Sequence, residues 1–553
     1  MKSLKIIFIA FLFAELFTVL VLGQDLKKSA KAEGYLAAKK LDINRIIFNV
    51  TNTGSRRSFN GSSFGIASIW NQYNYLYSGI VYDYGLWVAG KYNDKPALAI
   101  SQWDGSYSAG PIINRQAAML HNPSDSLKYR VYKITKGDDN SNPDYDEWPS
   151  NYGAPVDLSG NPKIYGDQTL WTAYNDYDST SAYINNWNAH FRDSITTLPI
   201  EVQQLTYARK GHVMDNVDIF SNVVFMEYKI INKGNINIDS AYIGFWSDID
   251  FLQAGSNPYA VDTSNQLAYC YSGDAGIDTI AVPPAVGFQY LYGPEVQSNG
   301  SFAIKDGKKI NGFKNLKMSS FHPVNDDTDI DSLSGSVFGV GEGWNVARGF
   351  DLKGNVIIDP TTNLPTKFPF SGDPGKGSGW IYPHKWTNGS AGILMFSGPF
   401  NFAPQDTQWV MIALIPAKGN DRFESIKIMK EKAAILGSLP YDSLAFGTNP
   451  YRIDYIDSTD NKIVIPSNYS ISQNYPNPFN PTTTIEYNIP KAGFVILKIY
   501  DILGREVRTL VNGEKAAGNY SITLNASSLA SGVYFYRLSA GTYTSIKKMV
   551  VLK

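Results

Sequence analysis

Residues 222–231 read NVVFMEYKII, residues 232–235 read NKGN, and residues 238–248 read IDSAYIGFWSD. The first and last segments are rich in β-branched and aromatic residues, which pack well on a pleated surface. The Asn-Lys-Gly-Asn between them has the composition of a turn. We therefore predict two strands joined as a hairpin, within an antiparallel β-sandwich.

Two further elements are predicted in the middle of the chain. Residues 406–415 read DTQWVMIALI, which is typical of a buried strand, and they follow Gly398-Pro399. Residues 422–437 place apolar side chains at helical spacing, and Gly437 is a plausible stop. We expect this helix to pack on an edge of the sandwich.

The bulk composition supports a mainly β protein. The chain has 553 residues, which is too long for one ordinary domain of about 100–200 residues. Charged residues make up 18%, below the usual ~25%, and 36 Tyr and 47 Gly fill the difference. The fold class expected is an antiparallel β-sandwich in the mature region plus a small C-terminal β-sandwich. A net charge of −1 argues against nucleic acid as a partner.

The N-terminus has the layout of a cleaved signal peptide. Lys2 and Lys5 precede an apolar run at residues 6–22, and small or tolerated residues before Gln24 predict cleavage there. A transmembrane anchor is the rival interpretation, but a span needs about 20 apolar residues and this run contains Glu15. No later segment is long and apolar enough to span a bilayer, so we expect no transmembrane segment after cleavage.

The C-terminal region predicts a second, smaller sandwich. Residues 474–481 read NYPNPFNP, and their prolines favour an extended lead-in because proline fixes φ and removes a donor. Short strand-like segments follow at a spacing of about 8–12 residues, which is typical of a β-sandwich. They are residues 484–489, 494–500, 506–510, 518–524, 531–538 and 544–552.

This region resembles the C-terminal sorting domain of type IX secretion, which is related to the immunoglobulin-like domain of flagellar hook-capping proteins. Where the family commonly has Trp-Asp-Gly, this chain has Leu-Asn-Ala at residues 524–526. The matching segments, in order, are residues 474–481 (NYPNPFNP), 500–505 (YDILGR), 517–520 (AGNY), 529–536 (LASGVYFY) and 547–553 (KKMVVLK).

The resemblance implies a route and a set of partners. It implies entry into the periplasm, passage through an outer-membrane translocon and removal of the domain by a sortase-like peptidase. The mature protein would end on surface lipopolysaccharide or in the medium. We expect a signal peptide at residues 1–23, a β-rich mature region of one or two units at 24–455, a linker at 456–469 and the immunoglobulin-like sorting domain at 470–553.

The middle of the chain also resembles a group of large, functionally uncharacterised surface proteins that carry the same sorting domain. That resemblance implies no activity and no site residues. It is carried by residues 85–90 (GLWVAG), 166–171 (GDQTLW), 246–250 (WSDID), 283–288 (PPAVGF) and 397–400 (SGPF).

Local catalytic signatures are weak. Cys270 is the single cysteine and lies in a strand-like run, so we expect it buried and inert. None of the five histidines forms a pair at zinc-ligand spacing. Residues 61–65 (GSSFG) match a nucleophile elbow without the required strand before them, and residues 339–343 (GVGEG) are predicted to form a turn. The five histidines are His121, His190, His212, His322 and His384.

An acidic loop is the best candidate for a metal site. Residues 138–147 read DDNSNPDYDE, and their alternating side-chain oxygens are the ligand type that calcium prefers. The loop lacks a glycine at the sharp turn, and Pro143 restricts its path. A solvated acidic loop without metal is the competing interpretation, as it is for the weaker run at residues 325–331.

The sequence therefore indicates an exported β-sandwich protein with a structural, adhesive or ligand-binding role. Its many Tyr and Trp residues could stack on the sugars of an extracellular glycan, although the same rings fill sandwich cores. The alternative is an extracellular hydrolase such as a glycosidase, with carboxylates among Glu227, Asp248 and Asp250 that meet only in the fold. We assign no catalytic, cofactor-binding or metal-ligating residue and expect no cofactor.

Overall fold

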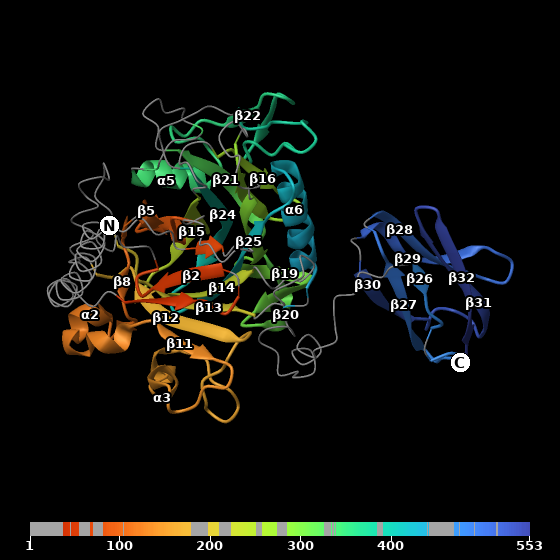
Figure 1. Ribbon diagram of the computed structural model, residues 1–553, viewed down its shortest axis with the longest axis horizontal. Coiled ribbons are helices and arrows are strands. Elements are labelled where there is room, and N and C mark those ends of the chain that lie inside the picture. The colour runs from red at the N-terminus through yellow and green to blue at the C-terminus, as the bar shows by residue number, and fades with distance from the viewer. Residues whose placement is uncertain are drawn as a thin grey trace, which may run out of the picture. The chain divides into compact units, whose positions relative to one another are not determined.

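The computed structural model shows two compact units, described separately below (Figure 1). Their described residues lie between 37 and 441 and between 469 and 552. Within these limits the described residues exclude 45, 55–66, 70–80, 103, 179–196, 210–222, 250–256, 274–284, 326–332, 334–336, 338, 384–390, 440, 475, 492 and 516–517. The predicted signal peptide and linker fall largely outside the described residues.

The larger unit is built on a nine-stranded antiparallel sheet. Its strand order is β11-β12-β13-β14-β25-β18-β17-β16, and β8 also pairs with β12. The predicted strand at residues 406–415 is confirmed as β25. The bounds are β8 (Ser108–Ala109), β11 (Tyr132–Thr135), β12 (Gln168–Asn175), β13 (Ile200–Ala208), β14 (Val224–Asn232), β16 (Tyr259–Asp262), β17 (Leu267–Tyr271), β18 (Ala285–Tyr292) and β25 (Thr407–Ala417).

A five-stranded antiparallel sheet packs on one face of the first, with the order β21-β24-β15-β4-β5. Rings from both sheets meet between them, with the Phe245 and Phe288 centroids 4.8 Å apart and those of Tyr228 and Phe245 6.4 Å apart. The mainly β, antiparallel fold class is confirmed. The bounds are β4 (Asp83–Tyr92), β5 (Lys95–Ala99), β15 (Ile238–Asp248), β21 (Met318–Asn325) and β24 (Ala391–Phe402).

The predicted hairpin at residues 222–248 is wrong, although both of its strands exist. Strand β14 pairs with β13 and β25, whereas β15 pairs with β4 and β24, so the chain crosses from one sheet to the other. The Asn232 amide holds this crossing by donating to the carbonyl oxygens of Ile236 (3.1 Å) and Phe402 (2.9 Å). Both strands are buried on both faces, so each packs against the other sheet while pairing with different neighbours.

Two helices cover the outer faces of the sheets. Helix α5 (Val340–Ala347) lies over an apolar cluster on the five-stranded sheet. The turn predicted at residues 339–343 is therefore wrong, because these residues begin that helix. Helix α6 (Arg422–Ser438) confirms the predicted helix; Asp421 caps it by accepting from the Glu424 backbone N–H at 2.8 Å.

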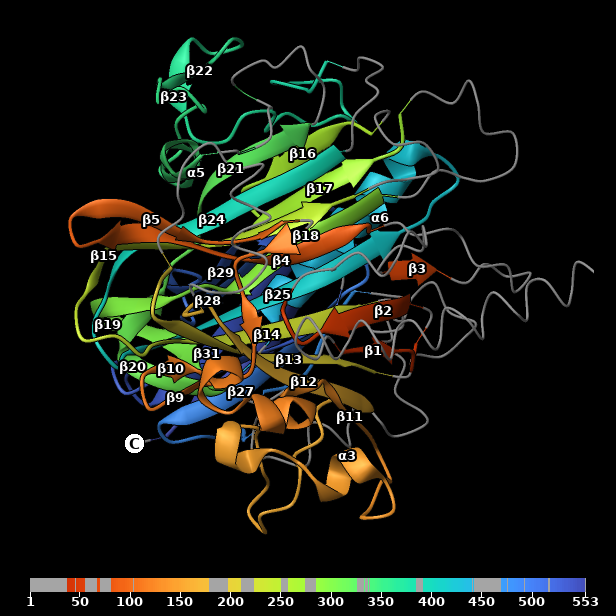
Figure 2. The ribbon, with the colours of Figure 1, turned by 90° about the vertical axis from the view of Figure 1, so that its left-hand side faces the viewer.

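Helix α6 lies on the outer face of the nine-stranded sheet and not on an edge as expected. It contacts β17, β18 and β25 (Figures 1 and 2). The helix approaches the sheet closely at Gly287, where an added Cβ would lie 3.0 Å from Met429 Sδ. The apolar residues of α6 recur at helical spacing and face the sheet. They cover the outward side chains of β17, β18 and β25, which would otherwise be exposed to solvent. They are Ile426, Met429, Ala433 and Leu436.

Smaller elements surround these sheets. The pair β19–β20 contacts β25 and lines one cleft together with α6. The bounds are β1 (Ala38–Leu41), β2 (Ile46–Thr51), β3 (Ala67–Ile69), β6 (Ser101–Gln102), β7 (Asp104–Gly105), β9 (Ile112–Ile113), β10 (Gln116–Ala117), β19 (Glu295–Lys305), β20 (Lys308–Asn315), β22 (Ile357–Asp359), β23 (Leu364–Thr366), α2 (Ala118–His121), α3 (Pro143–Asp146), η1 (Pro123–Tyr129) and η2 (Ser150–Tyr152).

The smaller unit has a three-stranded sheet, β26-β27-β30, and a four-stranded sheet, β29-β28-β31-β32. Burial alternates along its strands, as in β27, so one face of each sheet packs on a shared core. All six predicted strands are confirmed. The bounds are β26 (Ser470–Ile471), β27 (Thr482–Ile489), β28 (Gly493–Tyr500), β29 (Glu506–Lys515), β30 (Gly518–Asn525), β31 (Gly532–Ala540) and β32 (Tyr543–Val551).

The lead-in of the smaller unit is fixed by Asn474. Its backbone N–H donates to Tyr536 Oη at 2.8 Å, and its side-chain amide donates to Thr483 Oγ1 at 2.9 Å. The turn between β28 and β29 is closed by Asp501, which accepts from the backbone N–H groups of Leu503 and Arg505. Gly504 in this turn has a φ of 77°, a conformation that favours glycine.

Candidate functional site

The carboxylates suggested for a hydrolase do not meet. Strand β14 alternates, and its neighbours Met226 and Tyr228 lie in the core between the sheets, so Glu227 faces the outer side of the nine-stranded sheet. Asp248 shares the face of Trp246, which packs on the outer side of the five-stranded sheet. The two acids therefore point away from each other through both sheets. Asp250 lies outside the described residues.

The acidic loop at residues 138–147 uses its oxygens on protein partners. Asp144 is buried and forms ion pairs with Lys39 and Arg130, at 3.1 Å for the latter. Asp138 accepts from the backbone N–H of Thr135 at 2.8 Å. Within the described part of the chain no group of three His, Cys, Asp or Glu residues is placed to hold a metal ion. These carboxylates therefore already have partners within the protein.

Cys270, the five histidines and residues 61–65 are the other positions that the sequence suggested for chemistry. Cys270 is confirmed as buried, and it faces the core together with Ala268. His121 is exposed and contacts Gln116, and His322 is buried in β21. The elbow-like segment at 61–65 and the remaining three histidines lie outside the described residues.

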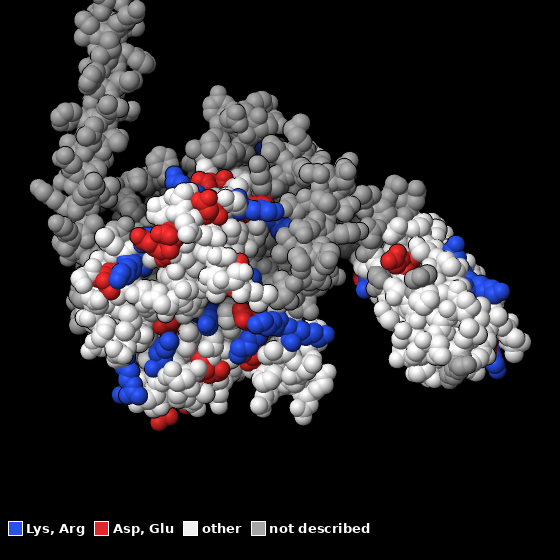
Figure 3. Space-filling view, turned by 90° about the horizontal axis from the view of Figure 1, so that it is seen from below, with Lys and Arg blue, Asp and Glu red and all other residues white. Residues whose placement is uncertain are grey.

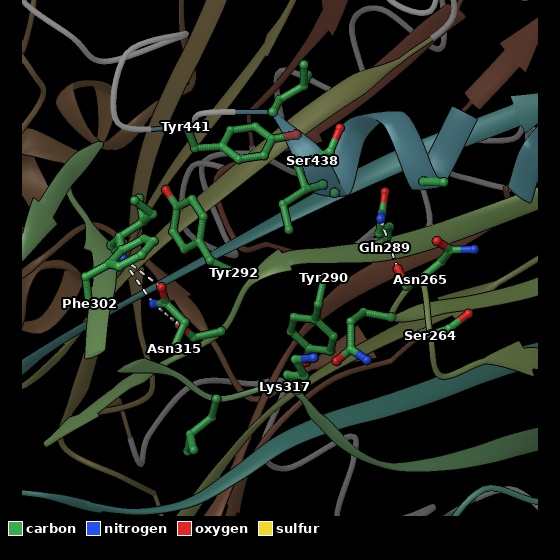
Figure 4. A pocket seen from close by; sticks show the side chains of 18 of the residues that line it. Ser264, Asn265, Gln289, Tyr290, Tyr292, Phe302, Asn315, Lys317, Ser438 and Tyr441 are labelled. Carbon is green, nitrogen blue, oxygen red and sulfur yellow. Dashed lines mark hydrogen bonds between the residues drawn. The ribbon is translucent and has the colours of Figure 1, made fainter. Parts of the chain in front are cut away.

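A cleft opens on the outer face of the nine-stranded sheet, between the end of β18 and the end of α6. We call it the β18–α6 cleft. Its volume is about 700 Å³, within the range of small-molecule sites. Strand β18 forms the floor, the β19–β20 pair and α6 form walls, and the turn at residues 264–266 closes one end (Figure 4). Its aromatic and amide lining includes Gln266, Gln289, Tyr292, Phe302, Asn315 and Tyr441.

A β-bulge places Tyr292 in this cleft. Tyr290 is opposite Ile412 on β25, but Tyr292 is opposite Met411, so the register shifts by one residue. Without the shift Tyr292 would face the core like Tyr290, since side chains alternate along a strand. Tyr292 instead packs against Tyr441, with ring centroids 6.2 Å apart.

The hydroxyl of Tyr292 connects the cleft to Glu227. It donates to Glu227 Oε2 at 2.5 Å. Burial raises the pKa of Glu227 to about 8, and the Tyr292 hydrogen bond and the Lys163 charge offset this only in part. Burial beside this carboxyl also raises the pKa of Tyr292 well above its ordinary value. A protonated Glu227 behind the tyrosine therefore keeps this wall of the cleft uncharged near neutral pH.

Two of the amides in the cleft serve mainly to hold its walls. Asn315 donates to the carbonyl oxygens of Gly293 (2.8 Å) and Ile304 (2.9 Å). Gln266 accepts from the Met318 backbone N–H at 2.6 Å. These contacts anchor the β19–β20 pair and the closing turn, so the cleft is preformed.

Gln289 differs from the other amides. Its Nε2 donates to the carbonyl oxygens of Asn265 (2.9 Å) and Ala433 (2.8 Å), which fixes the side chain between the closing turn and α6. Its Oε1 is buried and accepts no hydrogen bond from any described residue. The atom is closed off from solvent, so it belongs to the packing beneath the cleft and not to its open surface.

The charged residues that line the cleft are basic. Lys309 and Lys317 line the cleft, and none of the described lining residues is Asp or Glu. Lys309 Nζ lies 3.8 Å from the centroid of the Phe302 ring. Elsewhere the larger unit mixes charges of both signs, as Figure 3 shows for the face seen from below.

Sequence reasoning did not find this cleft. Gln289, Phe302 and Tyr441 come from three separate elements, and no local spacing joins them. The bulge that exposes Tyr292 has no signal in the alternating pattern of β18. The run of lysines between residues 305 and 317 was the one visible sign, because it is unusual in so charge-poor a chain.

Comparison with protein families accounts for the smaller unit. Residues 473–552 match the family described as secretion system C-terminal sorting domain. This segment is a type IX secretion sorting domain. The chain is thus a type IX secretion cargo, and the domain implies interaction with the secretion machinery and export across the outer membrane to the surface or medium. No helix in the described residues is long and apolar enough to cross a membrane.

Comparison of the whole chain is less informative. No curated protein matches it. Solved structures similar to it include a polysaccharide lyase (8% identity, TM-score 0.25, covering 91% of this chain and 47% of that one) and a heparinase III (6%, 0.22, 89% and 41%). PorZ of Porphyromonas gingivalis, a surface component of its type IX secretion system, is also similar (10%, 0.14, 71% and 45%). The chain spans less than half of each, and likenesses this distant carry no argument about fold or function.

Proposed function

We propose that the larger unit binds an extracellular carbohydrate in the β18–α6 cleft after export. The observation that carries this proposal is the Phe302 ring, which is 52% exposed, on the wall of a preformed cleft that amide side chains also line. The C–H face of a sugar ring can stack on an exposed aromatic side chain, and sugar hydroxyls can form hydrogen bonds with amide side chains.

The test is a glycan array probed with the purified full chain, followed by titration of the best ligands. Phe302→Ala should weaken binding about tenfold, because it removes the stacking surface without disturbing the core. Phe423→Ala is the matched control, since Phe423 is also an exposed phenylalanine (40%) of the larger unit but does not line the cleft. The proposal fails when no glycan binds, or when both variants reduce binding equally.

The remaining organisation forms part of the same proposal. Residues 1–23 act as a signal peptide, 24–455 form the mature region, 456–469 a linker and 470–553 an immunoglobulin-like sorting domain. A sortase-like peptidase removes that domain, and the mature protein is then attached to lipopolysaccharide or released. Protein recovered from cells and medium should start at Gln24, which N-terminal sequencing would check.

The alternative, an extracellular hydrolase such as a glycosidase, has less support. Glycosidases use two carboxyl groups about 5–9.5 Å apart across the substrate. Glu227 and Asp248 lie on opposite outer faces, and none of the described lining residues of the cleft is acidic. A binding role needs no such pair.

A further inference from the structure

The lysines of the β19–β20 pair and of the segment that follows it differ in their partners. Lys305 forms an ion pair with Glu295, and Lys308 forms one with Asp306 at 3.4 Å. Lys309 and Lys317, which line the cleft, form no ion pair with any described residue. Lys309 and Lys317 are thus available to an external anion, as is Lys314, which is exposed and does not line the cleft.

The surroundings of the cleft keep its potential positive at these lysines. Asp262, which comes just before the closing turn, accepts from Ser264 (2.5 Å) and Asn265 (2.9 Å). Glu227 lies behind Tyr292, and its pKa of about 8 leaves it largely protonated near neutral pH. Two ammonium groups without counter-charge in a concave site attract an anion.

The wall of the cleft opposite these lysines carries a partial negative charge. Helix α6 ends at Ser438, and the carbonyl groups of its last turn give that end a partial negative charge. Some of these groups are already used, since Leu436 O accepts from Tyr441 Oη at 2.8 Å. A ligand with an anion at one end and hydroxyl donors at the other therefore fits the cleft in one orientation.

We infer that the β18–α6 cleft binds an acidic sugar, with the carboxylate of a hexuronate residue held by Lys309 and Lys317. Its ring lies against Phe302. This inference rests on the proposed carbohydrate binding and adds the charge of the ligand. A sulfate ester would offer a similar anion, so the test separates the two.

The test measures binding of the full chain to matched oligosaccharides by calorimetry. The probes are oligomers of galacturonate, glucuronate, mannuronate and guluronate, each paired with its carboxyl-reduced neutral form, together with sulfated neutral oligomers. At least one uronate should bind at least tenfold more tightly than its reduced form. That preference should shrink as salt rises, because salt screens exposed charges.

Variants connect the preference to the two lysines. Lys309→Gln with Lys317→Gln should weaken uronate binding about tenfold or more and leave neutral sugars unaffected. Lys314→Gln is the matched control, since Lys314 is an exposed lysine of β20 that does not line the cleft. Thermal unfolding of each variant checks that the fold is retained.

The outcomes distinguish the two proposals. Equal binding of acidic and reduced sugars, or preference for the sulfated oligomers alone, overturns the uronate inference and leaves carbohydrate binding intact. A uronate preference that survives in the double-lysine variant also overturns it. Binding of no sugar, acidic or neutral, overturns the proposed function itself.

Discussion

The two units of this protein are both built from packed antiparallel sheets, yet they differ in how many faces they bury. Strands β12 and β13 of the larger unit are buried at every position. In the sorting domain, burial alternates along β27 and β31, so one face of each sheet is largely exposed. The larger unit therefore needs covering elements on its outer faces, and the sorting domain does not.

This difference explains where a binding site can form. Helix α6 and the β19–β20 pair cover the nine-stranded sheet incompletely, and the gap between them is the β18–α6 cleft. The sorting domain instead exposes apolar side chains such as Phe494 and Ile546 on a bare sheet. Its described residues form a sandwich with its own core, which suits a module that acts in transport.

Deleting the sorting domain tests whether the two units have separate roles. A chain lacking residues 466–553 should remain in the periplasm, because the signal that the secretion machinery reads is gone. Immunoblots of periplasmic, surface and medium fractions would measure this, with the full chain as control. Because the larger unit has its own core, the truncated protein should keep its thermal unfolding transition. Normal surface levels of the truncated protein would contradict the division of roles.

A pair of phenylalanines tests the difference in burial. Phe396 lies on the outer face of the five-stranded sheet and is fully buried, with its ring 6.4 Å from that of Trp87. Phe396→Ala should lower the free energy of unfolding by about 3–5 kcal/mol, because it leaves a cavity under α5.

Phe494 is the matched residue of the sorting domain and is 51% exposed. Phe494→Ala should change the free energy of unfolding by no more than about 0.5 kcal/mol. Denaturant titration of each variant would compare them. Similar losses of the free energy of unfolding in the two variants would show that the outer faces of the two units do not differ in burial.

The same difference determines what the sequence could predict. In the sorting domain a period of two marks each strand and its buried face, so all six strands were predicted. In the larger unit residues 224–232 and 238–248 carry apolar side chains on both faces together with a few polar ones, and such runs predict strands without their partners. The turn residues between them suggested a hairpin, but Asn232 instead fixes a crossing between sheets. Pairing across the sheet is a tertiary property that the local pattern does not contain.

The cleft was less predictable than the fold for a related reason. Its residues are joined by a bulge at Tyr290–Tyr292 and by the docking of α6, and neither follows from local composition. The sequence did indicate aromatic side chains suited to a sugar. It did not show which of them, such as Phe302, the fold would leave exposed.

Glu227 provides a pH test of the covered face. Its pKa is about 8 in the folded protein against an ordinary 4.5, because burial disfavours the carboxylate. The folded state therefore binds more protons than the unfolded state between these values, and the free energy of unfolding should fall as pH rises from about 4.5 to about 8. Glu227→Gln should remove this contribution, which is on the order of a few kcal/mol at pH 8.

The measurement is denaturant unfolding of both proteins between pH 5 and 8.5. Some slope should remain in the variant, because burial also raises the pKa of Asp176 to about 8. Asp139→Asn is the control, since Asp139 is exposed and its pKa is lowered by its hydrogen bonds with Ser141. An unchanged pH slope in Glu227→Gln would mean that this carboxyl is hydrated and that the outer face is less covered than its burial indicates.

A smaller effect than that of Glu227→Gln is expected at Cys270. This thiol is fully buried in β17 and faces the core beside Ala268, so its role is packing rather than chemistry. Cys270→Ala removes one sulfur atom and should lower the free energy of unfolding by about 1 kcal/mol without changing sugar binding.

In the native protein a thiol reagent should label Cys270 only at the slow rate of unfolding, whereas denaturant should give complete labelling. The exposed outer strands of the sorting domain carry no cysteine for comparison, so a single cysteine introduced at Ile546, which is 57% exposed, supplies the fast reference in a Cys270→Ala background. Fast labelling of native Cys270, with loss of binding in the alanine variant, would mean that the core between the sheets opens. The larger unit would then not be buried on both faces at β17, and the contrast with the sorting domain would not hold there.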